Sequence, residues 1–534
     1  MQIPHVQFSN INCKDLILSI SLFSLLLGWR LIYIEHGWVN DDFVLYHEVA
    51  RLFAAGEYKE GFKLYNWPLY PALISALHCM TGLSLLVAAQ CLNILFFGLT
   101  TLSFLYLILI AGGGKVTIVA GALLLFSAHY ITGDVVAMLV RDPGFWGFFL
   151  TSLIFFIQYC RQPSTKNALL WQLFAIIATL FRIEGLTFLV FLPLMLLTTD
   201  FANAPKITPF TQRVFLYLKA NTLNVAILVG LIALFILTPN FTIKDLGRLQ
   251  EVAALFDNKI DQTFITIDSR ADLLAAEVLK GHFDDYALQG LFFALFGVTV
   301  LKIIGALGWL NLGLSSYFFF NKLQNFNSNV LRILTYIAIL AFVNIFVILL
   351  SVMLLSTRYI VPFVLIMLIF ASFGLGSLLE SFIKLERHRI QMMPARVKLL
   401  KAAILIIMLS ILGGLIGNIL PKKASNNFEQ EAVTYLTEQK ISNKRMFFVS
   451  PRVRFYAGAD YAGRGYDHWD YIQNAIEDKS IYQFDYLLLN LHVDEKYENN
   501  KQILDKSLTQ YQLIKEFYSY KKKKKVMVYK KNNL

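Results

Sequence analysis

Apolar runs long enough to cross a bilayer recur between residues 16 and 420, and this pattern constrains the fold more than any other feature of the sequence. A membrane helix needs about 20 mostly apolar residues to cross ~30 Å of hydrocarbon. Only 16% of the residues are charged, compared with about 25% in soluble domains. The strands of a membrane barrel would alternate in hydropathy instead. The sequence therefore predicts a polytopic α-helical membrane protein.

About eleven membrane segments are predicted from these runs. They lie near residues 16–34, 84–111, 116–132, 144–160, two short segments within 168–199, then 221–238, 288–312, 331–355, 360–380 and 401–420. They form a predicted transmembrane domain over 1–420, whose large polar loops span 35–83 and 239–287. In the second loop, the apolar spacing from Leu246 to Phe256 predicts a helix on the membrane surface.

Lysine and arginine are concentrated in the loops after the second, fourth, sixth, eighth and tenth segments. The positive-inside rule makes these loops cytoplasmic, so the loops that hold Asp42, Asp142 and Arg358 are expected to face outward. The net charge of +12 follows from this topology and does not indicate nucleic-acid binding. Short loops and modest size favour the inner (cytoplasmic) membrane of a bacterium.

Residues 421–534 differ in character from the rest of the chain. Three short strand-like runs occur there, at 446–449, 486–489 and 526–529, with helical patterns between them. This alternation predicts a small soluble α/β domain on the extracytoplasmic side. The five lysines from Lys521 to Lys525 are interpreted as the solvated turn of a hairpin.

Two adjacent acids, Asp41 and Asp42, begin the first large loop and precede a helical pattern that stops near Gly56. An aspartate at this place commonly caps a helix or interacts with its dipole. Alternatively, a carboxylate at the membrane–water boundary can take the proton of an acceptor hydroxyl during a displacement. These residues alone leave both interpretations open.

Arg182 and Glu184 interrupt a stretch that is otherwise apolar from 168 to 199. Ionisable residues within membrane segments are costly and need a partner or a water-filled cavity. We expect Arg182 to meet an anionic headgroup and Glu184 to pair with Arg182.

Two further charged positions have a simple and a functional interpretation. Arg141 and Asp142, before Pro143, are typical of an ion pair at a helix start, but Asp142 could also hold a divalent metal or orient an acceptor. Arg358 could be an interfacial arginine whose charged end reaches water. As a phosphate ligand it would instead use its planar fork.

In order and spacing, these residues resemble the GT-C integral-membrane glycosyltransferases, and most closely the protein O-mannosyltransferase and lipid A aminoarabinose transferase group. The resemblance rests on Asp42, Tyr46 and Ala50, on Pro68-Leu69-Tyr70-Pro71 and Thr81-Gly82-Leu83, and on Asp142, Arg182-Ile183-Glu184-Gly185 and Arg358-Tyr359. A soluble C-terminal α/β domain is also common in that group.

The resemblance implies transfer of a sugar from a polyprenyl- or dolichyl-phosphate carrier to an acceptor on the outer face, with inversion. It makes a first-loop acid the catalytic base. The spacing to Tyr46 and Ala50 aligns that base with Asp42 and leaves Asp41 a capping or supporting role. Cations near the outer face would bind the donor phosphate: Arg182, Arg358 and Lys63. Three further residues would support the acceptor or a metal ion: Asp142, Glu184 and Arg141.

The chain departs from the group at two places in the first loop. Asn66-Trp67 stands where a lysine often precedes the first-loop proline pair, and Lys63 is the nearest base. Phe43 comes after Asp42, where a glutamate is often found beside the catalytic acid. The resemblance therefore implies neither aminoarabinose as the sugar nor a metal requirement.

The predicted function is an inverting glycosyltransferase of the cell envelope. Its predicted partners are a polyprenyl-phosphate-sugar donor, a glycan, lipid or protein acceptor, and membrane lipids, with no nucleic acid. No cofactor is indicated beyond a candidate divalent metal ion. A transporter or flippase of lipid-linked glycans is the alternative. It would need polar residues through the middle of several segments. Many transporter folds also contain internal repeats, and this sequence has none of fixed period. A membrane glycan polymerase or ligase would share the donor and differ in the acceptor.

Overall fold

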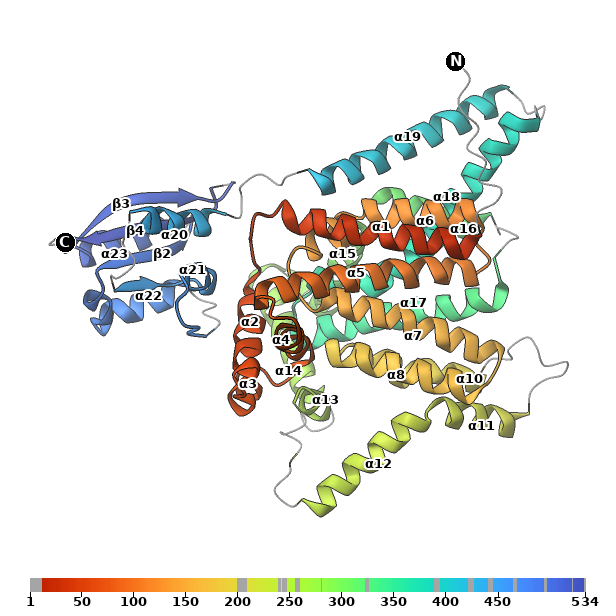
Figure 1. The fold of residues 1–534 in the computed structure, drawn as a ribbon, viewed down its shortest axis with the longest axis horizontal. Helices are drawn as coiled ribbons and strands as arrows, with labels where there is room; N and C mark the ends of the chain where they lie inside the picture. Colours follow the sequence, from red (N-terminus) through yellow and green to blue (C-terminus); the bar gives the residue numbers. More distant parts are fainter. Residues whose placement is uncertain are drawn as a thin grey trace. The chain divides into compact units, whose positions relative to one another are not determined.

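The computed structural model describes residues 12–198, 209–238, 242, 247–254, 260–279, 281–321, 326–388, 394–420, 427–439, 445–463, 468–493, 497–520 and 522–532 (Figure 1). The chain separates into two compact units. One, called here the helical unit, comprises Met1–Trp29, Leu92–Val136 and Arg141–Ile419. The other, called the sheet unit, comprises Arg30–Cys91, Ala137–Val140 and Leu420–Leu534.

Seven helical stretches in the described part of the chain are long and apolar enough to cross a membrane. They are α1 (Cys13–Tyr33), α5 (Leu85–Ile110), α7 (Asp142–Arg161), the stretch that includes α15 (Ala287–Leu307), α17 (Ser328–Val352), α18 (Val361–His388) and α19 (Pro394–Ile419). Two bent pairs raise the number to nine: α6 (Lys115–Ser127) with η1 (His129–Val135), and α11 (Phe210–Ala220) with α12 (Thr222–Leu237). These nine coincide with nine predicted segments, and the predicted helical membrane architecture is confirmed.

The remaining two predicted segments, within 168–199, form shorter apolar helices. They are α8 (Thr165–Phe181) and a succession of α9 (Gly185–Phe191), η2 (Leu192–Leu194) and α10 (Met195–Thr198). The chain breaks between them at Arg182, as the charged residues predicted. In the second large loop, α13 (Leu249–Ala254) lies within the predicted surface helix, and α14 (Ile260–Glu277) and η5 (Gly281–Tyr286) follow it. Leu246 and Phe256 lie outside the described residues.

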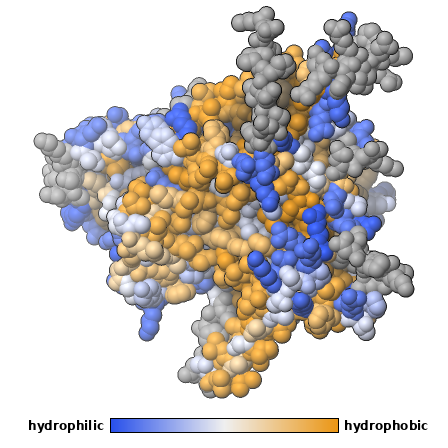
Figure 2. All heavy atoms as spheres, turned by 45° about the vertical axis from the view of Figure 1, so that its right-hand side comes forward, coloured by the Kyte–Doolittle hydropathy of each residue, from blue (hydrophilic) through white to orange (hydrophobic). Residues whose placement is uncertain are grey.

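Close packing in the helical unit centres on α18, which contacts α6, α17 and the short helix α16 (Trp309–Phe320). Gly374 of α18 faces the carbonyl oxygen of Leu314 so closely that an added Cβ would overlap it. By contrast, large apolar side chains of α12, α15 and α19 are exposed, including Leu237, Phe293 and Leu399. Figure 2 shows broad hydrophobic areas on the visible face. Exposed apolar faces on long helices are what a lipid environment requires.

The first large loop of the sheet unit forms three helices. They are α2 (Asp41–Ala54), α3 (Tyr58–Leu64) and α4 (Leu69–Thr81). The predicted helix before Gly56 is therefore present. Its N-cap is Asn40, whose side chain accepts a hydrogen bond from the Asp42 N–H at 2.9 Å. The expectation that an aspartate caps this helix is wrong, but both aspartates lie in its first turn, where the expected interaction with the helix dipole is possible. Tyr46 of α2 packs on Tyr65 and Tyr70, with ring centroids 5.5 and 5.4 Å apart, which joins the aromatic-proline motif to the helix.

The C-terminal part of the sheet unit is a four-stranded sheet in the order β1-β2-β4-β3. The strands are β1 (Met446–Phe448), β2 (Tyr486–His492), β3 (Tyr511–Tyr518) and β4 (Lys524–Lys531). β1 pairs with β2 in parallel, and the other two pairings are antiparallel. The helices are α20 (Phe428–Glu438), α21 (Pro451–Tyr456), α22 (His468–Glu477) and α23 (Tyr497–Ser507). The predicted α/β fold is confirmed.

Alternating side chains of the strands build one apolar core on each face of the sheet. Leu487 and Met527 pack in one core with α22 and α23, and Leu488 and Val528 pack in the other with α20. The predicted lysine-rich hairpin turn joins β3 to β4 and continues into β4, where Lys525 is buried and lies 2.6 Å from Glu516. Lys521 lies outside the described residues.

Candidate functional site

Arg182 is the centre of a buried charge cluster in the helical unit. It follows the last residue of α8, and its side chain is only 2% exposed. Its guanidinium pairs with the Asp142 carboxylate at the start of α7 and with Glu184, 3.0 Å away. The predicted Arg182–Glu184 pair is present. Asp142, predicted as the ion-pair partner of Arg141, pairs with Arg182.

Two glycines allow this cluster to form. An added Cβ on Gly144, in the first turn of α7, would overlap the buried ring of Phe181. An added Cβ on Gly185 would stand 2.9 Å from the Thr179 Cα. Because Gly185 has no side chain, the break after α8 can fold tightly. Because protein interiors are close-packed, neither position tolerates a side chain without movement of its neighbours. Small residues therefore bring the Asp142 and Arg182 helices together.

Arg358, far along the chain, converges on the same place. It lies in η6 (Thr357–Tyr359), between α17 and α18. The ring of Tyr359 is 5.0 Å from the Arg182 guanidinium carbon and 5.9 Å from that of Arg358. Two of the predicted phosphate ligands thus share one aromatic neighbour. Arg141 is also buried and interacts electrostatically with Glu184. Three guanidiniums against two carboxylates leave these five side chains with a net positive charge.

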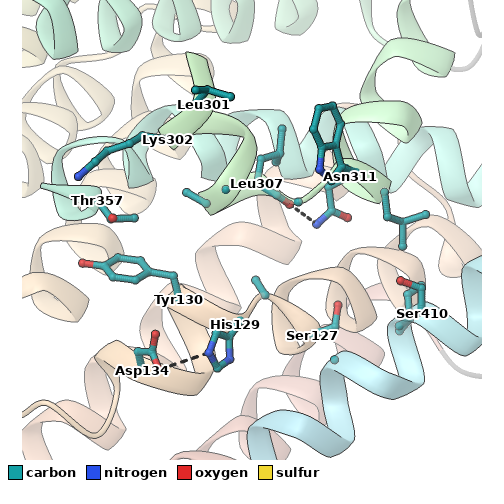
Figure 3. Close-up of a pocket in the computed structure, with 18 of the residues that line it drawn as sticks. Ser127, His129, Tyr130, Asp134, Leu301, Lys302, Leu307, Asn311, Thr357 and Ser410 are labelled. Carbon is teal, nitrogen blue, oxygen red and sulfur yellow. Dashed lines mark hydrogen bonds and ion pairs between the residues drawn. The ribbon is translucent and has the colours of Figure 1, made fainter. Parts of the chain in front are cut away.

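A cavity of about 840 Å³ lies in the helical unit beside this cluster. Apolar residues of α15, α16 and α19 form much of its wall, including Leu301, Leu307, Trp309 and Ile411. Figure 3 shows a polar side of the cavity, where Lys302, Thr357, Tyr130, His129 and Asp134 gather. Tyr130 links the cavity to the charge cluster, since it interacts electrostatically with Asp142, Arg182 and Arg358. The cavity is therefore amphipathic, with the cation Lys302 at its polar side.

Lys302 is a cation of the cavity that was not predicted as a site residue. It belongs to α15, a helix of otherwise apolar character, and its ammonium group donates to the carbonyl oxygen of Leu355. A lysine within an apolar segment is the signal that could have identified it. His129 and Asp134, 3.7 Å apart, were also not predicted. Their short π-helical turn has no sequence motif.

In the sheet unit, the two adjacent acids of α2 have different surroundings. Asp41 is 59% exposed, and its carboxylate lies 3.0 Å from Nε of Arg452. The same Nε lies 2.7 Å from Glu429, which is only 1% exposed. Asp42 is partly buried, and its backbone N–H is held by Asn40. An arginine of the C-terminal region thus neutralises Asp41, the acid to which the spacing assigned a supporting role.

The surroundings of this second cluster alter its titration. Burial raises the pKa of Glu429 above its ordinary value, although Arg452 opposes the change. Burial also lowers the pKa of His468, which interacts electrostatically with Asp41. Glu429, Arg452 and His468 were not predicted as site residues, because their roles depend on contacts between distant parts of the chain.

Lys63, the third predicted phosphate ligand, lies on α3. Its side chain is 81% exposed and stands 3.8 Å from Glu60. Within the sheet unit it belongs to a surface pair rather than to the Arg452 cluster.

The described residues contain no group of three or more His, Cys, Asp or Glu side chains that could hold a metal ion. The two acids that were candidates for metal support, Asp142 and Glu184, both face the Arg182 guanidinium. Their charge is balanced by an organic cation, and the donor set does not fit a divalent ion. We derive no step through a metal.

Comparison with protein-family models and with curated proteins finds no match. Among solved structures, the crystal structure of ArnT from Cupriavidus metallidurans bound to undecaprenyl phosphate is similar to this chain. The TM-score is 0.48 at 12% sequence identity, and the match covers 96% of this chain and 97% of that chain. At this identity and score, the likeness assigns neither a residue role nor a substrate to this chain.

Proposed function

We propose that this protein is a membrane glycosyltransferase that moves a sugar from a polyprenyl-phosphate carrier to an acceptor at the outer face of the membrane. The observation that supports this most is the convergence of Arg182 and Arg358 on Tyr359 beside an amphipathic cavity. A lipid phosphate has the same two-part character, an anionic head and an apolar chain. The apolar helices of the unit give such a lipid direct access from the bilayer.

The arginine cluster is assigned to the donor phosphate. A polyprenyl-phospho-sugar is a phosphodiester with one negative charge, and loss of the sugar leaves a phosphate monoester with a second. Cations already in place at that phosphate stabilise the developing charge without reorganisation. Arg358 offers a planar donor fork for phosphate oxygens. Arg182, whose Nε and Nη2 groups donate to Glu184, adds its positive charge, and Lys302 adds a point charge at the cavity. The carrier chain then occupies the apolar part of the cavity.

Asp42 is assigned as the base. In the transfer, the acceptor oxygen forms a bond to the anomeric carbon while the bond from that carbon to the phosphate oxygen breaks. The acceptor proton passes to the Asp42 carboxylate, and the carrier leaves as polyprenyl phosphate. Attack opposite the leaving group inverts the sugar configuration. The charge of Asp41 is balanced by Arg452. Asp41 is therefore assigned a supporting role beside the base Asp42.

Asp142 and Glu184 hold the Arg182 guanidinium in one orientation, and Arg141 adds positive charge nearby. A guanidinium that is pre-oriented loses less entropy when it binds a phosphate. These three residues therefore act on the donor site through Arg182, and the acceptor role implied for them by the family resemblance is secondary in this proposal.

The decisive experiment measures sugar transfer by the purified protein from a set of polyprenyl-phosphate sugars. Asp42→Asn is expected to lower kcat by about 10²–10⁴-fold, the usual contribution of a general base. Asp41→Asn should lower it less. Asp505→Asn, on the exposed face of α23, is the matched control and should match the wild type.

Two outcomes would contradict the assignment. Full activity of Asp42→Asn together with an inactive Asp41→Asn would move the base to Asp41. If neither substitution changes the rate, the base mechanism is wrong.

A flippase would translocate labelled lipid-linked sugar without transferring it, so the same preparations in vesicles separate a flippase from a transferase. Acceptors offered as free glycans, lipids or peptides separate a glycan polymerase or ligase from the other transferases.

A further inference from the structure

Arg452 of α21 connects two segments of the sheet unit that are far apart in sequence, α20 and α2. Its Nε lies 2.7 Å from the Glu429 carboxylate of α20 and 3.0 Å from the Asp41 carboxylate of α2. The guanidinium is mostly buried, while Asp41 is largely exposed. One arginine therefore ties the first turn of a loop helix to the C-terminal α/β region.

The Glu429 side of this bridge is rigid. Glu429 is 1% exposed, and its second carboxylate oxygen accepts a hydrogen bond of 2.6 Å from the Asn490 amide in the central strand β2. Burial opposes the charge on Arg452, but Glu429 and Asp41 together raise its pKa, so it stays a cation. The bridge is thus attached to the sheet through Glu429 and contacts α2 through Asp41.

Two further contacts between α21 and the first loop point the same way. The ring of Phe455 packs on Phe43 and His47 of α2, with centroids 5.9 and 5.1 Å apart. The hydroxyl of Tyr456 accepts a hydrogen bond of 3.1 Å from the Val39 N–H, just before the helix. Residues three and four apart share one face of a helix, so α21 presents Arg452, Phe455 and Tyr456 to the same segment.

Stability alone does not explain the contact with Asp41. Exposed ion pairs contribute little to folding, and the buried partner Glu429 already balances Arg452. What the contact with Asp41 fixes is the direction of the first turn of α2. Asp42 is the next residue, and its carboxylate depends on that turn for its position.

We propose that Arg452 is a positioning residue for sugar transfer: by bridging Glu429 and Asp41, it fixes the first turn of α2 so that Asp42 presents its carboxylate to the acceptor. The inference rests on the proposed function, in which Asp42 is the base. It adds that the C-terminal region takes part in the reaction through Arg452 without touching the substrate.

The kinetic test compares three variants with the wild type. Arg452→Gln is expected to lower kcat by about 10²-fold, the cost of a misplacement on the order of 1 Å, with little change in KM for the donor. Arg452→Lys, which keeps the charge, should recover part of that loss. Arg445→Gln is the matched control, because Arg445 is exposed and pairs only loosely with Asp485, at 3.6 Å.

The Asp41→Asn variant is the control for misfolding of the Arg452 variants, because it breaks the link to α2 and leaves the Arg452–Glu429 pair intact. If the two residues act as one unit, Asp41→Asn in an Arg452→Gln background should cause no further loss. A loss in the double variant equal to the product of the single losses would overturn the proposal, as would a change confined to KM.

Amide hydrogen exchange of the full-length protein tests the positioning directly. In both Arg452→Gln and Asp41→Asn, the amides of α2 should exchange faster, by up to about fivefold for Asp41→Asn, which corresponds to the ~1 kcal/mol that an exposed ion pair contributes at most, while β2 stays protected. Unchanged exchange in α2 would overturn the proposal. A wild-type protein without transferase activity would overturn the proposed function, and the exchange result would still decide whether Arg452 holds α2.

Discussion

Two arginines of this protein each bridge a pair of carboxylates, in opposite surroundings. Arg182, in the helical unit, and its partner Asp142 are buried, and its other partner Glu184 is only 11% exposed. Arg452, in the sheet unit, has one buried partner and one that is largely exposed, Asp41. Removing one member of a buried ion pair is strongly destabilising, because a desolvated charge is left without a partner. Removing an exposed member costs little.

The two arginines therefore put the same chemistry to two uses. The Arg182 cluster is expected to be needed for folding as well as for binding, since the Arg182 guanidinium balances the charges of Asp142 and Glu184. At the Arg452 bridge, loss of the exposed Asp41 contact can change the position of a helix without threatening the fold, whereas loss of Arg452 itself also leaves Glu429 buried without its cation. Mutations at the two places should therefore differ in whether stability or turnover changes more.

The largest effect is expected from Arg182→Ala. It leaves Asp142 and Glu184 buried without their cation, so the free energy of unfolding should fall by about 3–5 kcal/mol. Denaturant unfolding in detergent measures this change. Arg332→Ala, on the exposed side of α17, is the control and should leave the unfolding free energy unaltered. Equal stability of the two variants would remove the contrast between the arginines.

Gly144→Ala should come next, because it tests how Asp142 reaches Arg182. The new methyl group overlaps the buried Phe181 ring, and overpacking of this kind costs about 1–3 kcal/mol. Thermal unfolding checks the loss. Gly230→Ala in α12 is the matched control, since its Cβ would meet no atom within 4 Å and alanine favours a helix by roughly 0.5–1 kcal/mol. Destabilisation by Gly230→Ala instead would show that the effect is not steric.

A smaller effect is expected from Lys302→Met, which tests whether the cavity shares the donor site with Arg182. Loss of a charged hydrogen bond to a phosphate corresponds to ~1.5–3 kcal/mol, so KM for the donor should rise about tenfold or more. Steady-state transfer kinetics at varied donor concentration measure it. Lys384→Met, exposed near the end of α18, should leave KM unchanged. An unaltered KM in Lys302→Met would exclude the cavity from donor binding.

The smallest effect concerns the pH dependence of the sheet unit. The folded-state pKa of Glu429 lies above its ordinary value of 4.5, so the folded protein binds more protons than the unfolded chain as pH rises past that value. The contribution of Glu429 to the free energy of unfolding should therefore fall as pH increases from about 4.5 through the folded-state pKa. Glu429→Gln should flatten this part of the melting-temperature profile, while Glu431→Gln, exposed on the same helix, should not. A profile unchanged by Glu429→Gln would contradict the assignment.

Most of the architecture was predictable from the sequence. Continuous apolar runs located nine spans and the two shorter helices around Arg182, because each pattern reflects burial along one local segment. Local patterns also located α2 and three of the four strands. β3 was missed because its residues, from Tyr511 to Tyr518, neither alternate in polarity nor form a continuous apolar run, and its pairing with β4 shifts register between Leu513 and Lys515. Asn40 was missed as the cap because two adjacent aspartates offered an equally good local signal.

The site divides in the same way. By itself, the sequence determined that charges must interrupt apolar helices at Arg182 and Arg358, since such residues stand out against their neighbours. Only the tertiary structure decided that both arginines meet at Tyr359, that Lys302 joins a cavity beside them, and that Arg452 lies against Asp41. The physical reason is that hydropathy is a property of one segment, whereas the partner of a charge is chosen by the packing of segments far apart in the chain.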